Sequence, residues 1–328
     1  MKKVLLPSLL AVTSCLILLS FKFKSTTRWG FYAHQKINRI AVFTLPPEML
    51  TFYKTNIQYI TENAVNPDRR RYAVKGEAPR HYIDLDVYGD SAVYKLPRYW
   101  YDAVEKFTED TLKAYGIVPW HVQFMTYQLT EAFKEKDPDK ILRLSADLGH
   151  YIADANVPLH TTENYNGQLS GQYGIHGFWE SRLPELYSDD YDFFVGKASY
   201  IKNTQLEIWK AVEQAHNCLD SVFTTEKHLT EKFKADEKYS SELRGNVNTK
   251  VYSREFSLAY HRQLSGQVER QMRKSIKMVG DFWYTAWVNA GQPDLNMLLD
   301  YYIAKEEIEE STTPEKTFPL RNHESGIE

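Results

Sequence analysis

The sequence predicts an all-α fold with a single multi-helix domain, and three observations support this prediction. Apolar residues recur three and four positions apart along most of the chain, which is the period of a helix with one buried face. Signals for strands are few, and the best of them, residues 82–86, is short. Only 15 Gly and 13 Pro occur among 328 residues and no internal repeat is visible, which favours one main domain.

The first half of the chain contains five segments with helical periodicity. They cover residues 33–43, 47–63, 100–115, 118–133 and 138–155. Pro119 and Pro138 support the helix starts near residues 118 and 138. A backbone N–H in the first turn of a helix has no partner within the helix, so proline, which lacks this N–H, is well tolerated there. Residues 66–79 are basic and lack this periodicity, so we expect a loop there.

The second half starts with a loop and then returns to helices. Three glycines fall within residues 164–174, and this glycine content predicts a loop. Helical periodicity resumes at residues 175–183, 201–223 and 251–289. Gly291 and Pro293 are typical of a helix end, so we expect the last long helix to stop before them.

The two ends of the chain differ from the helical body. Lys2 and Lys3 precede an almost wholly apolar run at residues 4–21, which is typical of an export signal. A run of this length also nearly spans a bilayer, and residues 12–15 loosely resemble a lipoprotein box, so the segment is alternatively a membrane anchor. We therefore divide the chain into an export signal or membrane anchor, a helical domain and a polar C-terminal tail, at residues 1–28, 29–304 and 305–328. Each alternative places the helical domain outside the cytoplasm, as a periplasmic, secreted or anchored protein that contacts a membrane only through its first segment.

The composition limits which partners the protein binds and which interactions stabilise its fold. Five of the 40 basic residues and none of the 43 acidic residues lie in residues 1–28, so the rest of the chain carries a net formal charge of −8. An acidic body argues against a broad basic surface for duplex nucleic acid. The cysteines are Cys15 and Cys218, so removal of the first segment leaves no disulfide. The stability of an exported domain without disulfides depends on its hydrophobic core, on bound metal, or on both.

Two pairs of histidine and carboxylate indicate metal binding. His150 and Asp154 stand four residues apart in a predicted helix, which puts both on one face, and His176 and Glu180 repeat this spacing. Imidazole and carboxylate are the ligands that zinc accepts outside thiolate sites, and His160 lies between the pairs. One such pair alone is more often an exposed ion pair. Two pairs and a further histidine among apolar neighbours favour metal, because burying unpaired charges costs free energy.

The spacing of these five residues resembles that of a known superfamily. His150-x3-Asp154-x5-His160, followed by His176-x3-Glu180, resembles the zinc-dependent phospholipases C of bacteria and the zinc-dependent single-strand nucleases of fungi and plants. Both groups belong to one superfamily of all-helical, trinuclear zinc phosphodiesterases. Further matches to the nucleases lie upstream, at Trp29-Gly30-x3-His34, Asp68-x2-Arg71 and His81-Tyr82-Ile83-Asp84. The matches keep the order of the family over about half of the chain.

The resemblance implies three zinc ions and names their ligands. The first ion would take Asp68, His81, His150 and one oxygen of Asp154. The second would take His160, His176 and Glu180. The third would take His34, the other oxygen of Asp154, and the amine and carbonyl of Trp29. A hydroxide formed from water on the metal would then attack phosphorus, with Asp68 at the catalytic metal. The other histidines lack a comparable set of ligands and are expected to be structural: His121, His216, His228, His261 and His323.

The resemblance also assigns roles to three residues that are not ligands. Arg71 would neutralise charge on the phosphoryl oxygens, although the run of three arginines that contains it is alternatively an ordinary solvated stretch. Tyr82 would stack on a base and Asp84 would bond its edge. The alternative for these two is that Tyr82 packs in the core and that Asp84 caps a helix.

Three departures from the nuclease pattern keep several functions open. Glu180 stands where the nucleases usually carry Asp and is the phospholipase-type residue, and the disulfides of the nucleases are absent. Trp29 offers its amine only after cleavage behind Arg28, which makes a poor signal-peptidase site. We expect a zinc-dependent hydrolase of phosphate esters, with a single-strand nuclease or nucleotidase-like endonuclease as the main hypothesis. The alternatives are a phospholipase C that acts on lipid head groups and a non-catalytic, zinc-stabilised binding protein.

Overall fold

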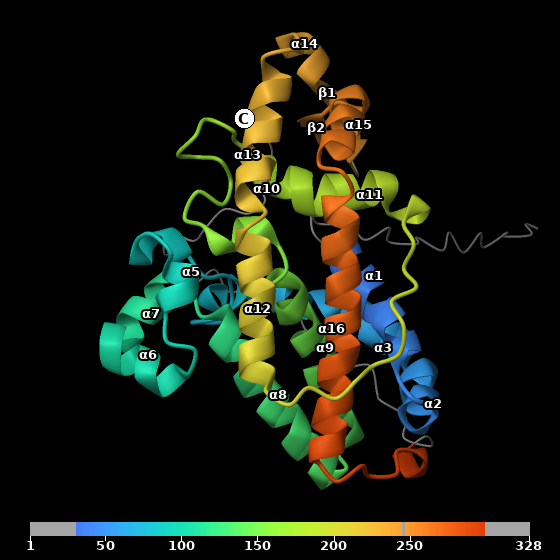
Figure 1. The fold of residues 1–328 in the computed structure, drawn as a ribbon. Helices are drawn as coiled ribbons and strands as arrows, with labels where there is room; N and C mark the ends of the chain where they lie inside the picture. Colours follow the sequence, from blue (N-terminus) through green and yellow to red (C-terminus); the bar gives the residue numbers. More distant parts are fainter. Residues whose placement is uncertain (1–30, 245–246, 299–328) are drawn as a thin grey trace, which may run out of the picture.

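The computed structural model describes residues 31–244 and 247–298, and this part of the chain is mostly helical (Figure 1). The predicted all-α class is confirmed, and one β-hairpin is the exception among the described residues. The first segment with Trp29, and the C-terminal tail, lie outside the described residues. Within the described part, no helix combines the length and the apolar character that crossing a bilayer requires.

Five helices build the centre of the fold. They are α1 (Phe31–Ala41), α8 (Val118–Glu135), α9 (Pro138–Asp154), α12 (Thr204–His216) and α16 (Gln267–Asn289). α9 packs against α1, α8 and α16, and α8 also packs against α12. Figure 1 shows the short helices α5 to α7 projecting to one side of this group, while α13, α14 and α15 gather at one end with the hairpin.

α9 has a capped start and a buried apolar face. The side chain of Asp137 accepts a hydrogen bond at 3.0 Å from the backbone N–H three residues on, which caps the helix. Ile141 and Leu148 are fully buried, and each such aliphatic side chain stabilises the fold by about 1.5–3 kcal/mol. The helix ends at Asp154, so His150 and Asp154 both lie in its last two turns.

A glycine lets α1 lie close to α9. A Cβ at Gly149 would overlap the side-chain amide of Asn38 on α1, so the close approach requires glycine. Nδ2 of Asn38 donates a hydrogen bond to the carbonyl of Ala146 at 3.0 Å across the same contact. Consequently His34 on α1 stacks on His150 of α9, with ring centroids 4.0 Å apart. The close packing of α1 on α9 therefore brings His34 and His150, which are far apart in the sequence, into contact.

Four of the predicted helices are divided in two by short breaks. The pieces are α2 (Pro47–Thr55) and α3 (Ile57–Glu62), α6 (Trp100–Phe107) and α7 (Glu109–Tyr115), α12 and α13 (Leu219–Thr230), and α15 (Arg254–Gln263) and α16. Thr108 has a φ of 66° and accepts a hydrogen bond from the start of α7, which explains the second break. Ser265 and Gly266 both have positive φ, which a continuous helix does not allow.

The best strand signal in the sequence, residues 82–86, does not form a strand. Tyr82 is extended, but the backbone groups of residues 82–84 bond to single positions elsewhere and not to a neighbouring strand. The N–H of Ile83 donates to the carbonyl of His160 at 2.9 Å, and the N–H of Asp84 donates to the carbonyl of Tyr115 at 2.7 Å. This segment therefore lies between two other parts of the chain and holds His81 next to His160.

Short elements connect these parts. The short helices are α4 (Asn66–Arg70), α5 (Ala92–Lys95), α10 (Ile175–Gly177), α11 (Leu183–Tyr187) and α14 (Ala235–Lys238), with a π-helical turn at Phe178–Arg182. Turns of 3-10 helix lie at Val42–Thr44, Asn63–Val65, Ala78–His81, Leu85–Tyr88, Pro158–Thr161, Ser188–Asp190 and Asn296–Leu298. α4 corrects the loop predicted for residues 66–79, because Pro67 opens a helical turn there. Residues 164–174 form turns, as the glycines predict.

The hairpin of β1 (Tyr239–Arg244) and β2 (Val247–Tyr252) is absent from the sequence prediction, which starts a helix at residue 251. The strands are antiparallel, and Tyr239 pairs with Tyr252. Arg182, at the end of the π-helical turn, forms a two-pronged ion pair with Glu242 of β1, in which Nη1 and Oε2 are 2.7 Å apart. The hairpin thereby supports the turn that carries Glu180.

Candidate metal centre

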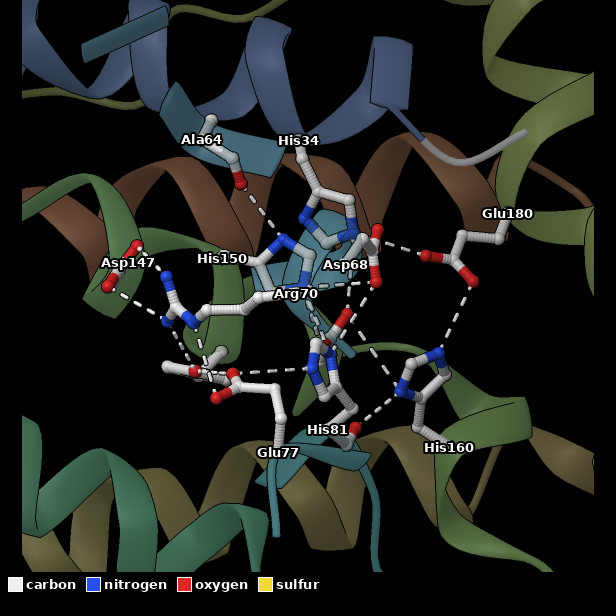
Figure 2. A network of polar contacts seen from close by, with 12 residues as sticks. His34, Ala64, Asp68, Arg70, Glu77, His81, Asp147, His150, His160 and Glu180 are labelled. Carbon is white, nitrogen blue, oxygen red and sulfur yellow. Dashed lines mark hydrogen bonds and ion pairs between the residues drawn. The ribbon is translucent and has the colours of Figure 1, made fainter. Parts of the chain in front are cut away.

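All the predicted metal ligands within the described residues converge in the interior of the fold. His34 comes from α1, Asp68 from α4, His150 and Asp154 from α9, and His176 from α10, while His81, His160 and Glu180 come from short turns. These eight residues form three groups, two of which share His150, and within each group the ligand atoms lie within 4.8 Å of one another. The groups are His34, His150 and Asp154; Asp68, His81 and His150; and His160, His176 and Glu180. Figure 2 shows several of their rings and carboxylates pointing toward a common centre. Trp29, the ninth predicted ligand, lies outside the described residues.

The first cluster consists of Asp68, His81, His150 and Asp154. His81 Nδ1 lies 2.9 Å from Asp154 Oδ2, 3.0 Å from His150 Nε2 and 3.7 Å from Asp68 Oδ1. His150 Nε2 lies 3.3 Å from Asp154 Oδ2 and 3.6 Å from Asp68 Oδ1. Tetrahedral ligands at zinc distances are separated by about 3.3 Å. The facing nitrogens of His81 and His150 thus lie at separations suited to zinc from each other and from each of the two carboxylates.

The second cluster consists of His160, His176 and Glu180. His160 Nε2 lies 3.0 Å from His176 Nε2 and 3.3 Å from Glu180 Oε2, and His176 Nε2 lies 2.6 Å from the same oxygen. Three protein ligands of these types are typical of a zinc site that keeps one position for water or substrate.

His34 lies between the two clusters and faces a carboxylate from each. Its Nε2 is 3.4 Å from Asp154 Oδ1 and 3.3 Å from Glu180 Oε1. Asp154 therefore presents one oxygen to the first cluster and the other to His34, as the resemblance implies. Glu180 does the same from the second cluster, which sequence reasoning did not anticipate. The two carboxylates link all three groups of ligands.

Backbone carbonyls fix the orientation of two ligand rings. Nδ1 of His150 lies 2.9 Å from the carbonyl oxygen of Ala64, and Nδ1 of His160 bonds to the carbonyl oxygen of His81. A carbonyl only accepts, so in each ring Nδ1 carries the proton. In the neutral tautomer Nε2 then has a free lone pair directed at the cluster, which is the form that binds a metal.

The centre combines buried carboxylates with buried histidines. Burial alone would raise the pKa of Asp154, but the charges of His150 and His160 outweigh it and hold this pKa well below its usual range. The pKa of Asp68 falls to about 2, because His150 and His81 outweigh its burial. Burial would lower the pKa of His150, yet Asp154 and Asp68 raise it well above its usual value. The carboxylates thus require nearby positive charge, which protons or metal cations supply.

The three predicted residues that are not ligands occupy different surroundings. Arg71 is buried while Arg69 is exposed, and Nε and Nη2 of Arg71 have no hydrogen-bond partner among the described residues. Tyr82 is only 8% exposed, and it packs so closely on Gly116 that a Cβ there would overlap its ring. Asp84 is also buried. Their roles in binding substrate stay predictions.

Sequence reasoning missed a buried network beside the first cluster. Arg70, which one of the two interpretations of its arginine run leaves solvated, forms an ion pair with Asp147 at 2.9 Å and another with Glu77 at 3.2 Å. The hydroxyl of Tyr151 accepts from Arg70 at 3.0 Å and donates to Glu77. Asp147 stands three residues before His150, and this helical spacing was an available signal. Glu77 stands four residues before His81, but we did not use this spacing because we expected a loop in that stretch.

Of the comparisons with known proteins, only the search of solved structures finds matches. No protein-family model matches this chain, and no curated protein matches it. Among solved structures, the chain is similar to the alpha toxin from Clostridium absonum, with 11% identity, a TM-score of 0.45 and coverage of 80% of this chain and 64% of the toxin. It is also similar to the alpha-toxin of Clostridium perfringens from avian strain SWCP, with 15% identity, a TM-score of 0.45 and coverage of 82% and 65%.

The chain thus spans slightly less than two thirds of the length of each toxin. The residues of the centre agree with the metal that the sequence predicts, since imidazole nitrogens and carboxylate oxygens lie at separations suited to zinc. The described chain is a mostly helical fold with a structural match among the clostridial alpha-toxins, and its buried histidines and carboxylates fit a multinuclear zinc site.

Proposed function

We propose that this chain is a zinc-dependent phosphodiesterase. The observation that carries the proposal is the sharing of Asp154 and Glu180 between neighbouring groups of ligands, because shared carboxylates hold divalent ions close together. Bound zinc ions supply a water of lowered pKa and polarise a phosphoryl oxygen. Asp68 and Glu180 are the most exposed ligands among those described, so a phosphate ester reaches the centre from their side. Arg71 offers unpaired guanidinium donors to the phosphoryl oxygens.

We favour a phospholipase C activity on lipid head groups as the specific reaction. Glu180 is the phospholipase-type residue at its position. Tyr82 is buried against Gly116, which leaves little of its ring for stacking on a base. Leu169 and Tyr173 are 70% and 55% exposed on the turns between His160 and His176, where apolar side chains suit contact with lipid. The acidic body also disfavours a polyanionic nucleic acid.

A single-strand nuclease is the second candidate function. The motifs Trp29-Gly30-x3-His34 and His81-Tyr82-Ile83-Asp84 support it, since they resemble nuclease motifs. Under either function we propose that residues 1–28 direct export, as their basic start and apolar run suggest. A zinc-stabilised protein without catalysis is the third possibility and is an outcome of the tests below.

The metal centre is tested by His150→Ala. We expect this variant to lose zinc from the first cluster and to lose hydrolysis of any phosphodiester substrate, because His150 supplies a buried ligand nitrogen. His228→Ala is the matched control, since His228 is exposed on α13 and lies outside all three groups of ligands. Zinc content by elemental analysis is the primary measurement. Equal zinc content in the wild type and in His150→Ala would contradict the proposal.

The substrate is tested by parallel assays of the zinc-loaded, exported chain on phosphatidylcholine vesicles and on single-stranded DNA. We expect release of the phosphorylated head group and little cleavage of DNA, with loss of activity in a chelator. Cleavage of DNA alone would make the nuclease the correct assignment. A zinc-loaded protein that hydrolyses neither substrate would support the non-catalytic hypothesis.

A further inference from the structure

Glu77 is a charged side chain buried completely beside the proposed metal centre, at 0% exposure. Its Oε2 lies 3.2 Å from Nε of Arg70 and 2.7 Å from Nη1 of Arg80. Its Oε1 accepts a hydrogen bond from Tyr151. Burying a carboxylate is costly unless its partners are held in place, and here two guanidinium groups and a hydroxyl fulfil that condition.

His81 presents its second nitrogen to this carboxylate. Nδ1 of His81 faces the first cluster, while Nε2 is buried and has no hydrogen-bond partner among the described residues. Oε1 of Glu77 lies 3.7 Å from this Nε2, which is slightly beyond hydrogen-bond distance. In His150 and His160, the nitrogen that faces away from the cluster already bonds to a backbone carbonyl. His81 differs from them in having a carboxylate at that position.

We propose that Glu77 is a positioning residue for the metal ligand His81. Its Oε1 accepts a hydrogen bond from Nε2–H when His81 binds metal, and the separation then shortens to about 2.8 Å. This bond selects the tautomer in which Nδ1 has a free lone pair, and an anionic acceptor also makes Nδ1 a stronger donor to the metal. The inference rests on the proposed zinc centre.

The network around Glu77 ties His81 to the helix that carries the other ligands. Arg70 contacts both oxygens of Asp147, with Nη1–Oδ1 at 3.2 Å and Nη2–Oδ2 at 2.9 Å, and it also contacts Glu77 (Figure 2). Asp147 and Tyr151 both belong to α9, as does His150. Two guanidinium groups, of Arg70 and Arg80, thus face two carboxylates, and the network is neutral as a whole. The orientation of His81 is therefore set relative to α9 itself.

The test is Glu77→Gln in the full exported chain, with zinc affinity as the readout. We expect the first-cluster zinc to bind about 10–100-fold more weakly, because a neutral amide is a weaker acceptor for Nε2–H. With Co²⁺ in place of zinc, the visible absorption spectrum should also change, since the orientation of a ligand ring changes. Asp281→Asn is the matched control. Asp281 pairs with Lys277 and accepts from the backbone N–H of Ser199 at 2.6 Å, and it lies outside the groups of metal ligands.

Thermal unfolding separates a positioning role from a general loss of stability. Both variants lose an ion-paired carboxylate, so both should melt earlier in a chelator, whereas the rise in Tm on adding zinc should shrink in Glu77→Gln alone. If Glu77→Gln does not fold, Glu77→Asp keeps the charge but withdraws the oxygen, and it should weaken zinc binding as well. Zinc affinity within about threefold of the wild type in the folded variant would overturn the inference, and so would an equal loss in Asp281→Asn.

The same measurements distinguish this inference from the proposed function. A wild-type chain that binds zinc but hydrolyses no phosphodiester would contradict the proposed function, while the affinity of Glu77→Gln would still decide the role of Glu77. A wild-type chain without zinc affinity would overturn both.

Discussion

Asp154 uses its two oxygens for two different groups of ligands, and Glu180 does the same. Oδ2 of Asp154 faces His81 and His150, while Oδ1 faces His34. A carboxylate in this position offsets the repulsion between two cations as well as binding each of them. The loss of one such side chain therefore affects more than one metal position, unlike the loss of a histidine at the edge of the centre.

Asp154→Asn should remove metal from two positions. The amide keeps the shape of the side chain but has one oxygen and no charge, so it cannot serve two cations. His176→Ala is the comparison, because His176 lies in the second cluster alone. We expect a larger fall in zinc per chain for Asp154→Asn, measured by elemental analysis after dialysis. Equal zinc contents in the two variants would show that Asp154 does not bridge.

Residue spacing alone identified candidate ligands only where it is local, and the resemblance supplied His34, Asp68 and His81. His150 and Asp154 share a helix face, so the four-residue spacing is enough to identify them. The contact of Glu77 with Tyr151 and the contact of Glu180 with His34 instead join residues 74 and 146 positions apart. No periodic pattern records such long-range contacts.

At the scale of elements, the contact between α1 and α9 decides where His34 lies. Gly149 allows the contact and Asn38 stabilises it through its hydrogen bond to the carbonyl of Ala146. The helices themselves were predictable because their apolar period is regular. The break at Thr108 was not predictable, because this residue adopts positive φ without being glycine.

Gly149→Ala should destabilise the fold by about 1–3 kcal/mol, because the new methyl group overlaps Asn38 and forces α1 away from α9. Urea denaturation in a chelator measures this loss without a contribution from metal. Asn38→Ala removes the overlapping amide, so the double variant should be more stable than the sum of the two single changes implies. Additive losses would indicate that the two side chains do not compete for the same space.

At the scale of the whole molecule, the buried His121 makes stability depend on pH. Burial, together with the charge of Arg80, lowers the pKa of His121 to about 3. The unfolded chain protonates this histidine near its ordinary pKa of 6.5. Between these two values the unfolded state binds more protons than the folded state, so the free energy of unfolding falls as the pH falls. The contribution of this one group is at most about 1.4 kcal/mol per pH unit.

His121→Phe should remove this dependence. The aromatic ring keeps the edge-on contact with Tyr151, where the centroids are now 4.5 Å apart, and Nε2 of His121 has no hydrogen-bond partner in the described part of the chain to lose. The variant should therefore gain stability relative to the wild type as the pH falls from about 7.5 to about 5. Urea denaturation at both pH values measures this gain, and a constant difference between the two proteins would refute it.

The segment at residues 82–84 connects a ligand of the first cluster to a ligand of the second. Its Ile83 bonds to the backbone of His160, and the carbonyl of His81 receives the bond from Nδ1 of His160. The backbone of His81, a ligand in the first cluster, thus holds the ring of His160, a ligand in the second cluster. We therefore expect occupation of one position to restrain a ligand of the other and to favour its filling.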